Sequence, residues 1–214
     1  MTLLKEFSSK LAKGSHGLQF LDIGSSGSID EKWGPIYNLI DLTGFDPNEE
    51  ECIAQNNAIT VHKSAQFLPY ALYGEDGYQQ LYKTDCEYCY SILKPNKDWL
   101  QRFSFWKLFE VRETQAIKVH CIDSIPQLDN YYPDIIKIDV QGVELPILKT
   151  AGKLLQSAFF VETESGFVQN YDNESVYSEV DQFMREAGYL LFDINCNHRV
   201  SRNNIIGEKL TGRE

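Results

Sequence analysis

The chain has 214 residues, a formal net charge of -11 and a hydrophobic fraction of 43%. This length suits one domain over 1–214, and no apolar run approaches the roughly 18 residues of a membrane-spanning helix. The acidic balance argues against a nucleic-acid partner. An odd count of five cysteines without an export signal favours reduced thiols and a cytoplasmic location.

The first half of the chain predicts an alternation of helices and strands. Residues 1–13 predict an amphipathic leading helix, because charged side chains interrupt the apolar ones. A turn at 74–77 between apolar segments at 68–73 and 78–82 predicts a hairpin-like region. The other expected elements are strands near 18–23, 41–45 and 59–63 and a helix near 48–56.

The second half returns to the same alternation after an irregular aromatic segment at 84–113. Strands are expected near 117–123, 135–139 and 159–162, and helices near 144–156 and 174–187, the last ending at Gly188. A strand at 189–194 and a returning strand at 199–206 predict a C-terminal antiparallel hairpin. The whole is an α/β chain with a doubly wound, mostly parallel sheet.

A small-residue turn follows the first predicted strand. Gly24 and Gly27 permit positive φ, so backbone N–H groups could face a ligand there. Asp46 follows the next strand, 24 positions after Asp22, near the roughly 20-residue offset at which an acid reaches a ribose hydroxyl. An ordinary strand and glycine turn remains the alternative.

Four predicted strands each end on an acidic residue, and these ends are expected at the same edge of the sheet. The four acids are Asp22, Asp46, Asp139 and Glu162. A cationic ligand would offset this clustered charge, and S-adenosylmethionine carries a sulfonium and an amine without phosphate. In this interpretation Asp46 accepts from the ribose diol, 24–27 admits the amino-acid end, and Asp139 lies near the methyl group.

A dinucleotide fits the same turn less well. The pattern G-x-G-x-x-G from Gly24 would need glycine where the chain has Ser26 and Ile29. A nicotinamide-dependent oxidoreductase and a non-catalytic cofactor-binding module stay open as alternatives.

Three motifs carry a resemblance to a known family. They are LDIGSSG at 21–27, GFDP at 44–47 and, most specifically, IKIDVQGVE at 136–144, with weaker echoes at 71–72, 91–93 and 161–162. In these the chain resembles the FkbM-type S-adenosylmethionine-dependent methyltransferases. The family usually has Gly-Ala-Asn or Gly-Ala-Arg at the first motif and Glu-Pro at the second, where this chain has Gly24-Ser25-Ser26 and Asp46-Pro47.

The resemblance implies a class I methyltransferase (Rossmann-like) fold, with a seven-stranded, mostly parallel sheet ending in an antiparallel hairpin. It also implies S-adenosyl-L-methionine as cofactor and O-methylation of a hydroxyl on a sugar or other small acceptor. The cofactor-binding residues expected from the motifs are Asp22, Gly24, Ser25, Gly27, Asp46, Pro47, Ala71, Leu72 and Asp139.

Carboxylates are the candidates for the catalytic base. Asp139 and Glu162 lead, with Glu164 behind them, and a base adds about 10²–10⁴-fold to such a reaction. Glu144 could share this site or merely favour a helix N-terminus. The same acids could hold a divalent metal, but no metal ligand is assigned.

Two further features of the sequence bear on metal binding and on the acceptor site. Cys86 and Cys89 form a lone C-x-x-C pair, which favours ordinary thiols over a four-ligand zinc site with His62, His120 or Cys121. The segment 84–113 combines aromatic and basic side chains, so we expect it to form the acceptor-side wall, although its aromatics could instead be core.

Overall fold

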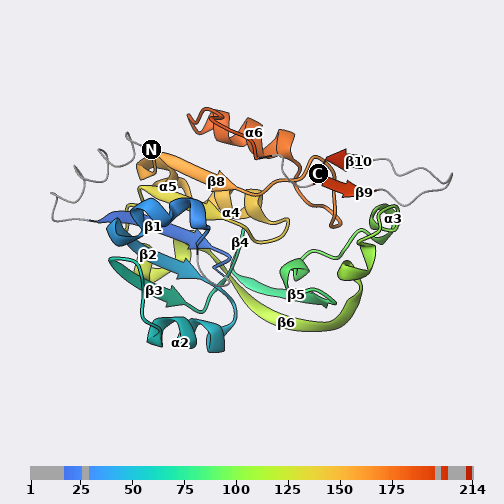
Figure 1. Ribbon diagram of the computed structural model, residues 1–214, viewed down its shortest axis with the longest axis horizontal. Coiled ribbons are helices and arrows are strands. Elements are labelled where there is room, and N and C mark those ends of the chain that lie inside the picture. Colours follow the sequence, from blue (N-terminus) through green and yellow to red (C-terminus); the bar gives the residue numbers. More distant parts are fainter. Residues whose placement is uncertain (1–16, 26–28, 196–198, 202–210, 214) are drawn as a thin grey trace. The chain divides into compact units, whose positions relative to one another are not determined.

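The computed structural model describes residues 17–25, 29–195, 199–201 and 211–213 (Figure 1). The predicted leading helix and Gly27 lie outside these residues. The chain divides into two compact units. The first comprises Met1–Asp76, Val119–Asp139 and Thr150–Thr163, and the second comprises Gly77–Lys118, Val140–Lys149 and Glu164–Glu214.

The first unit is built on a five-stranded parallel sheet (Figure 1). Its central strands β1 and β7 are mostly apolar and buried, because both faces of a parallel sheet are covered there. Predicted strands near 18–23, 41–45, 135–139 and 159–162 are confirmed. In spatial order the strands are β3 (Ser64–Leu68), β2 (Ile40–Phe45), β1 (Leu18–Ile23), β7 (Ile135–Ile138) and β8 (Phe160–Thr163).

The strand predicted at 59–63 is wrong, since β3 begins at Ser64. Ile59 and Val61 are 100% and 64% exposed, so the β-branched residues there have no sheet face to pack against. Phe67 and Leu68 are buried instead, opposite Gly44 and Phe45 of β2. Burial rather than propensity decides where this strand lies.

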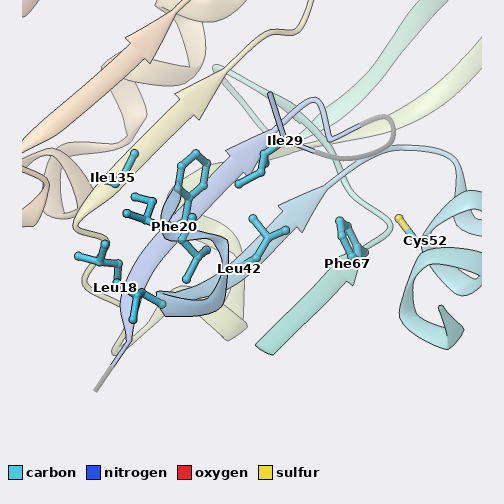
Figure 2. Close-up of a cluster of buried hydrophobic side chains, with 10 residues drawn as sticks. Leu18, Phe20, Ile29, Leu42, Cys52, Phe67 and Ile135 are labelled. Carbon is cyan, nitrogen blue, oxygen red and sulfur yellow. The ribbon is translucent and has the colours of Figure 1, made fainter. Parts of the chain in front are cut away.

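One face of the sheet carries the core shown in Figure 2. Strand register places Phe20 beside Leu42 and Ile135. The 3-10 helix η1 (Glu31–Leu39) contributes Trp33, which packs edge-on against Phe20 and Phe160 at ring distances of 5.3 and 5.8 Å. Aromatic and aliphatic burial on this scale fixes the register of the strands.

Gly44 in β2 is required by close packing. A Cβ atom there would lie 2.6 Å from Cδ1 of Phe67 and 2.7 Å from Oγ of Ser25. We expect Gly44→Ala to lower the free energy of unfolding by about 1–3 kcal/mol, because overpacking forces neighbours to shift. Chemical denaturation measures this.

Gly152→Ala is the matched control, because a Cβ at Gly152 meets nothing within 4 Å. It should leave stability unchanged or slightly raised, since alanine favours a helix. Equal stability of the two variants would contradict the packing argument.

The first unit also contains α2, β4 and short helical turns. α2 (Glu49–Asn57) is confirmed near its predicted range, and the Asn48 side chain caps it by accepting from the N–H of Glu51. β4 (Ala71–Tyr73) pairs in parallel with the end of β6 (Val111–Cys121), so it is not half of the expected hairpin. The remaining elements are η4 (Ile122–Ser124), η5 (Pro126–Leu128) and α5 (Gly152–Ser157).

The second unit holds the irregular segment expected at 84–113. Its elements are β5 (Gly77–Thr84), η2 (Glu87–Cys89), α3 (Lys97–Leu100), η3 (Trp106–Phe109), most of β6, α4 (Glu144–Thr150) and α6 (Tyr177–Glu186). The helix predicted at 144–156 is two helices, α4 and α5, interrupted at Ala151. Gly188 has φ +95° and follows α6, as predicted.

The C-terminal part differs from the expectation. Residues 189–194 form no strand, and Leu190 and Phe192 are 83% and 90% exposed. A strand needs a hydrogen-bonded neighbour, and no described residue pairs with this run. β9 (Arg199–Ser201) and β10 (Thr211–Arg213) form a separate antiparallel pair. The seven-stranded sheet with its C-terminal hairpin is therefore not confirmed. The described strands form three sheets: the five-stranded parallel sheet, the β9–β10 pair and a three-stranded sheet in the order β4-β6-β5.

Candidate active site

The register of the parallel sheet gathers charged side chains at one end of the first unit. Asp22 on β1 lies opposite Lys137 on β7, and Lys137 lies opposite Glu162 on β8. Side chains at these paired positions share a face, two residues beyond the Phe20 row of the core. We call the ends of β1, β2, β7 and β8, with the residues that follow, the carboxyl edge.

Asp22 and Lys137 form a buried ion pair. Lys137 Nζ donates to Asp22 Oδ1 at 3.1 Å, and the two side chains are 16% and 2% exposed. Burial raises the pKa of Asp22, and the ammonium of Lys137 opposes this rise. Burial acts to lower the pKa of Lys137, but attraction to Asp22 and the neighbouring acids raises it above its ordinary value. The lysine is therefore an ammonium and no base.

Lys137 was not singled out by the sequence, although a signal was present. A lysine between Ile136 and Ile138 in a strand buried on both faces needs an anionic partner. The register with β1 supplies that partner.

Asp139 directly follows β7. Its N–H donates to the carbonyl of Ile23 at 3.0 Å, which extends the sheet by one residue. Its carboxylate lies 4.0 Å from Lys137 Nζ and is 41% exposed. Asp139 is thus a carboxylate that both faces an ammonium and reaches solvent.

Glu162 is held by a second lysine. Lys32 on η1 donates to Glu162 Oε1 at 2.6 Å, with side-chain exposures of 47% and 28%. Lys32 comes from a segment whose charge pattern gave no sign of this contact. The structure therefore brings Asp22, Asp139 and Glu162 together with two ammonium groups.

Asp46 follows β2, the neighbour of β1. Its Oδ1 accepts from the N–H of Asn48 at 2.7 Å, an Asx turn that orients the carboxylate. Burial raises the pKa of Asp46, and the charges of Glu51 and Asp22 add to the rise. Pro47 is exposed beside it.

The glycine turn is only partly as expected. Gly24 has φ +83°, the left-handed conformation that the small residue permits. The N–H groups of Gly24 and Ser25 both donate to the carbonyl of Phe45, at 3.0 and 2.9 Å. Unpaired N–H groups were expected at the turn, and for these two residues that expectation is wrong because they tie β1 to β2.

Ala71 and Leu72 lie on β4, close in sequence to the end of β3. Leu72 is 6% exposed and belongs to the core, whereas Ala71 is half-buried. The N–H groups of Asp46 and Tyr70 both donate to the carbonyl of Leu68, at 3.2 and 2.9 Å. This shared acceptor brings the start of β4 near Asp46.

Glu144, in the second unit, shapes a turn. It is 4% exposed, and its carboxylate accepts from the N–H groups of Val140 and Gly142 at 3.0 Å each. The intervening Gln141 has φ +59° and donates through its amide to Glu164 at 3.0 Å. Glu144 therefore has a structural role in the loop that follows Asp139.

The aromatic segment of the second unit forms a continuous series of ring contacts, with centroid distances between 5.3 and 5.9 Å. Phe103 is buried and Arg102 lies over the Trp99 ring at 5.0 Å. At least part of this segment is therefore core. The series runs through Trp99, Phe103, Phe105, Phe109 and Tyr171.

The described residues also bear on thiol, metal and membrane-spanning sites. The cysteines Cys52, Cys86, Cys89 and Cys121 form no disulfide. No group of three or more metal-ligating side chains lies close enough there to hold a metal ion. No helix in the same part of the chain is long and apolar enough to span a membrane.

A family model described as the methyltransferase FkbM domain matches residues 28–191. The chain belongs to the FkbM methyltransferase family. The match covers most of the chain and parts of both units. No curated protein and no solved structure matches the chain. The resemblance to the FkbM family is thereby confirmed, the first motif at 21–27 lying before the matched residues, and the family supports a methyltransferase in general.

Proposed function

We propose that this FkbM-family protein is an S-adenosylmethionine-dependent O-methyltransferase that acts on a hydroxyl of a sugar or another small hydroxylated acceptor. The carboxyl edge of the first unit carries the proposal. It presents the carboxylates of Asp22, Asp139 and Glu162 against the ammonium groups of Lys137 and Lys32, and Asp46 adds a fourth carboxylate after β2. The excess negative charge suits a cationic ligand.

The donor set fits this cofactor. Asp46 keeps its second carboxylate oxygen for the ribose hydroxyls while Oδ1 holds the Asn48 N–H. Gly24 presents backbone without a side chain, and Asp22 adds negative charge on the same strand end. The other described residues of the proposed pocket are Pro47, Ser25, Ala71 and Leu72. When bound, the cofactor supplies a methyl group activated by its sulfonium.

Asp139 is the proposed base. Its exposed carboxylate can accept the proton of the acceptor hydroxyl as the oxygen is methylated. Glu162 is the second carboxylate, held by Lys32 and so suited to orienting the acceptor. Positioning of the acceptor supplies most of the rate, about 7–11 kcal/mol in well-oriented reactions.

Three further expectations belong to this proposal. The chain 1–214 acts as one methyltransferase domain, and the aromatic segment 84–113 contributes contacts to the acceptor. Described cysteines that form no disulfide favour a cytoplasmic location.

Transfer of a labelled methyl group tests the proposed reaction. The protein is incubated with methyl-labelled S-adenosylmethionine and a panel of monosaccharides and polyols. We expect label in a base-stable methyl ether of one acceptor class. Label only in base-labile esters or on nitrogen would contradict O-methylation of a hydroxyl.

Asp46→Ala tests the cofactor site. The loss of charge-assisted hydrogen bonds to the ribose should weaken S-adenosylhomocysteine binding by about 1.5–3 kcal/mol, as measured by calorimetry. Because the pKa of Asp46 is raised, wild-type affinity should fall as the pH drops through that value, where the carboxylate is protonated. The variant should lose this dependence.

Glu50→Ala is the control for Asp46→Ala. Glu50 is an exposed acid in the first turn of α2, so its loss removes the same charge nearby without touching the pocket. If both variants bind S-adenosylhomocysteine like the wild type, Asp46 has no ribose contact.

A further inference from the structure

The Asp22–Lys137–Asp139 group has an arrangement that the proposed reaction does not itself explain. The ammonium of Lys137 lies 3.1 Å from an oxygen of Asp22 and 4.0 Å from one of Asp139. Asp22 is on β1 and Asp139 follows β7, so the two acids come from adjacent strands. One cation therefore faces two carboxylates at the carboxyl edge.

Two carboxylates so close repel each other unless a cation lies between them. Burial raises the pKa of Asp22, the charge and hydrogen bond of Lys137 lower it, and the charge of Asp139 adds a smaller rise. A hydrogen bond with the hydroxyl of Ser25 also lowers the pKa of Asp22, and the charge of Asp22 in turn raises the pKa of Asp46. Glu162 faces Lys137 from β8 and is itself paired with Lys32.

We propose that Lys137 is a positioning residue for the methyl-transfer site: its ammonium separates Asp22 from Asp139 and favours the ionised form of the buried Asp22 at the carboxyl edge. The arrangement rests on contacts within the first unit alone. Its consequence for cofactor binding rests on the proposed function, because Asp22 belongs to the proposed pocket.

The titration of Asp22 tests this separation without cofactor or acceptor. The carboxyl carbon of Asp22 is followed by NMR against pH in the wild type and in Lys137→Met. Loss of the ammonium should raise the midpoint by about 1 pH unit or more. Lys137→Arg should restore a midpoint near that of the wild type, because it returns the charge.

A double variant isolates the separating role. In Lys137→Met/Asp139→Asn the second carboxylate is neutral, so part of the rise in the Asp22 midpoint should disappear. Asp139→Asn alone should move the midpoint less, because in the wild type Lys137 already offsets most of the repulsion that this substitution removes. An equal effect of Asp139→Asn with and without Lys137 would overturn the proposal.

Lys63→Met is the matched control. Lys63 pairs with Asp41 at 3.4 Å at the opposite end of the same sheet, so its loss removes one lysine charge but should leave the Asp22 midpoint unchanged. Where Lys137→Met fails to fold, Lys137→Gln keeps a hydrogen-bond donor without the charge. An Asp22 midpoint unmoved in a folded, uncharged variant would also overturn the proposal.

Cofactor binding separates this inference from the proposed function. Calorimetry with S-adenosylhomocysteine in two buffers of different ionisation enthalpy counts the protons released. We expect release on binding to Lys137→Met, where Asp22 must ionise, and little release with the wild type. If the wild type does not bind S-adenosylhomocysteine, the proposed function is wrong, but the role of Lys137 beside Asp22 is not affected. If Lys137→Met binds it without releasing protons, Lys137 does not control the ionisation of Asp22 in the cofactor pocket.

Discussion

Asp139→Asn is expected to lower methyl-transfer turnover by about 10²–10⁴-fold. The amide has nearly the same shape as the carboxylate but cannot accept the proton of the acceptor hydroxyl. Because Asp139 directly follows β7 and is 41% exposed, the fold should persist. Single-turnover transfer and S-adenosylhomocysteine affinity, measured on the same preparation, check this.

Asp129→Asn is the control for charge loss, since Asp129 is exposed on the connection after η5. It should leave turnover unchanged. A collapse of cofactor affinity in Asp139→Asn, with single-turnover chemistry intact, would instead make Asp139 a cofactor anchor.

Lys137→Met is expected to lower the free energy of unfolding by about 3–5 kcal/mol. The physical reason is that Asp22, only 2% exposed, would lose the ammonium that offsets its burial, so folding must leave it either as an uncompensated charge or as a buried acid that has taken up a proton. Chemical denaturation at neutral pH measures the loss. Asp22→Asn/Lys137→Met removes both charges and should recover much of it, because no buried ion remains.

The pH dependence of the same variant has a definite sign. The pKa of Asp22 is raised in the folded state, so its protonated form stabilises the fold below the unfolded-state pKa. That contribution is lost as the pH rises through the folded-state pKa. The deficit of Lys137→Met relative to the wild type should therefore be smallest at acidic pH, and a deficit that grows on acidification would contradict the burial argument.

Sequence patterns located much of the sheet because its strands are short, apolar and end on acids. Asp22, Asp46, Asp139 and Glu162 were expected at one edge, and parallel register puts their strand ends there. The irregular segment at 84–113 was also visible, since its aromatics have no strand or helix period.

The features that were missed depend on contacts between distant segments. Lys137 and Lys32 became site residues only through their pairs with Asp22 and Glu162, 115 and 130 positions away. The start of β3 depended on which residues face Gly44, and the paired N–H groups of the glycine turn depended on the Phe45 carbonyl. Local sequence propensity does not predict any of these contacts, because each depends on a residue far away in the chain.

Calorimetric titration of S-adenosylhomocysteine, NAD and NADP into the wild-type protein tests the central claim most directly. We predict that S-adenosylhomocysteine binds at one site, with affinity that falls in Asp46→Ala and persists in Glu50→Ala, and that neither dinucleotide binds comparably. Tight binding of NAD or NADP without binding of S-adenosylhomocysteine would contradict the account.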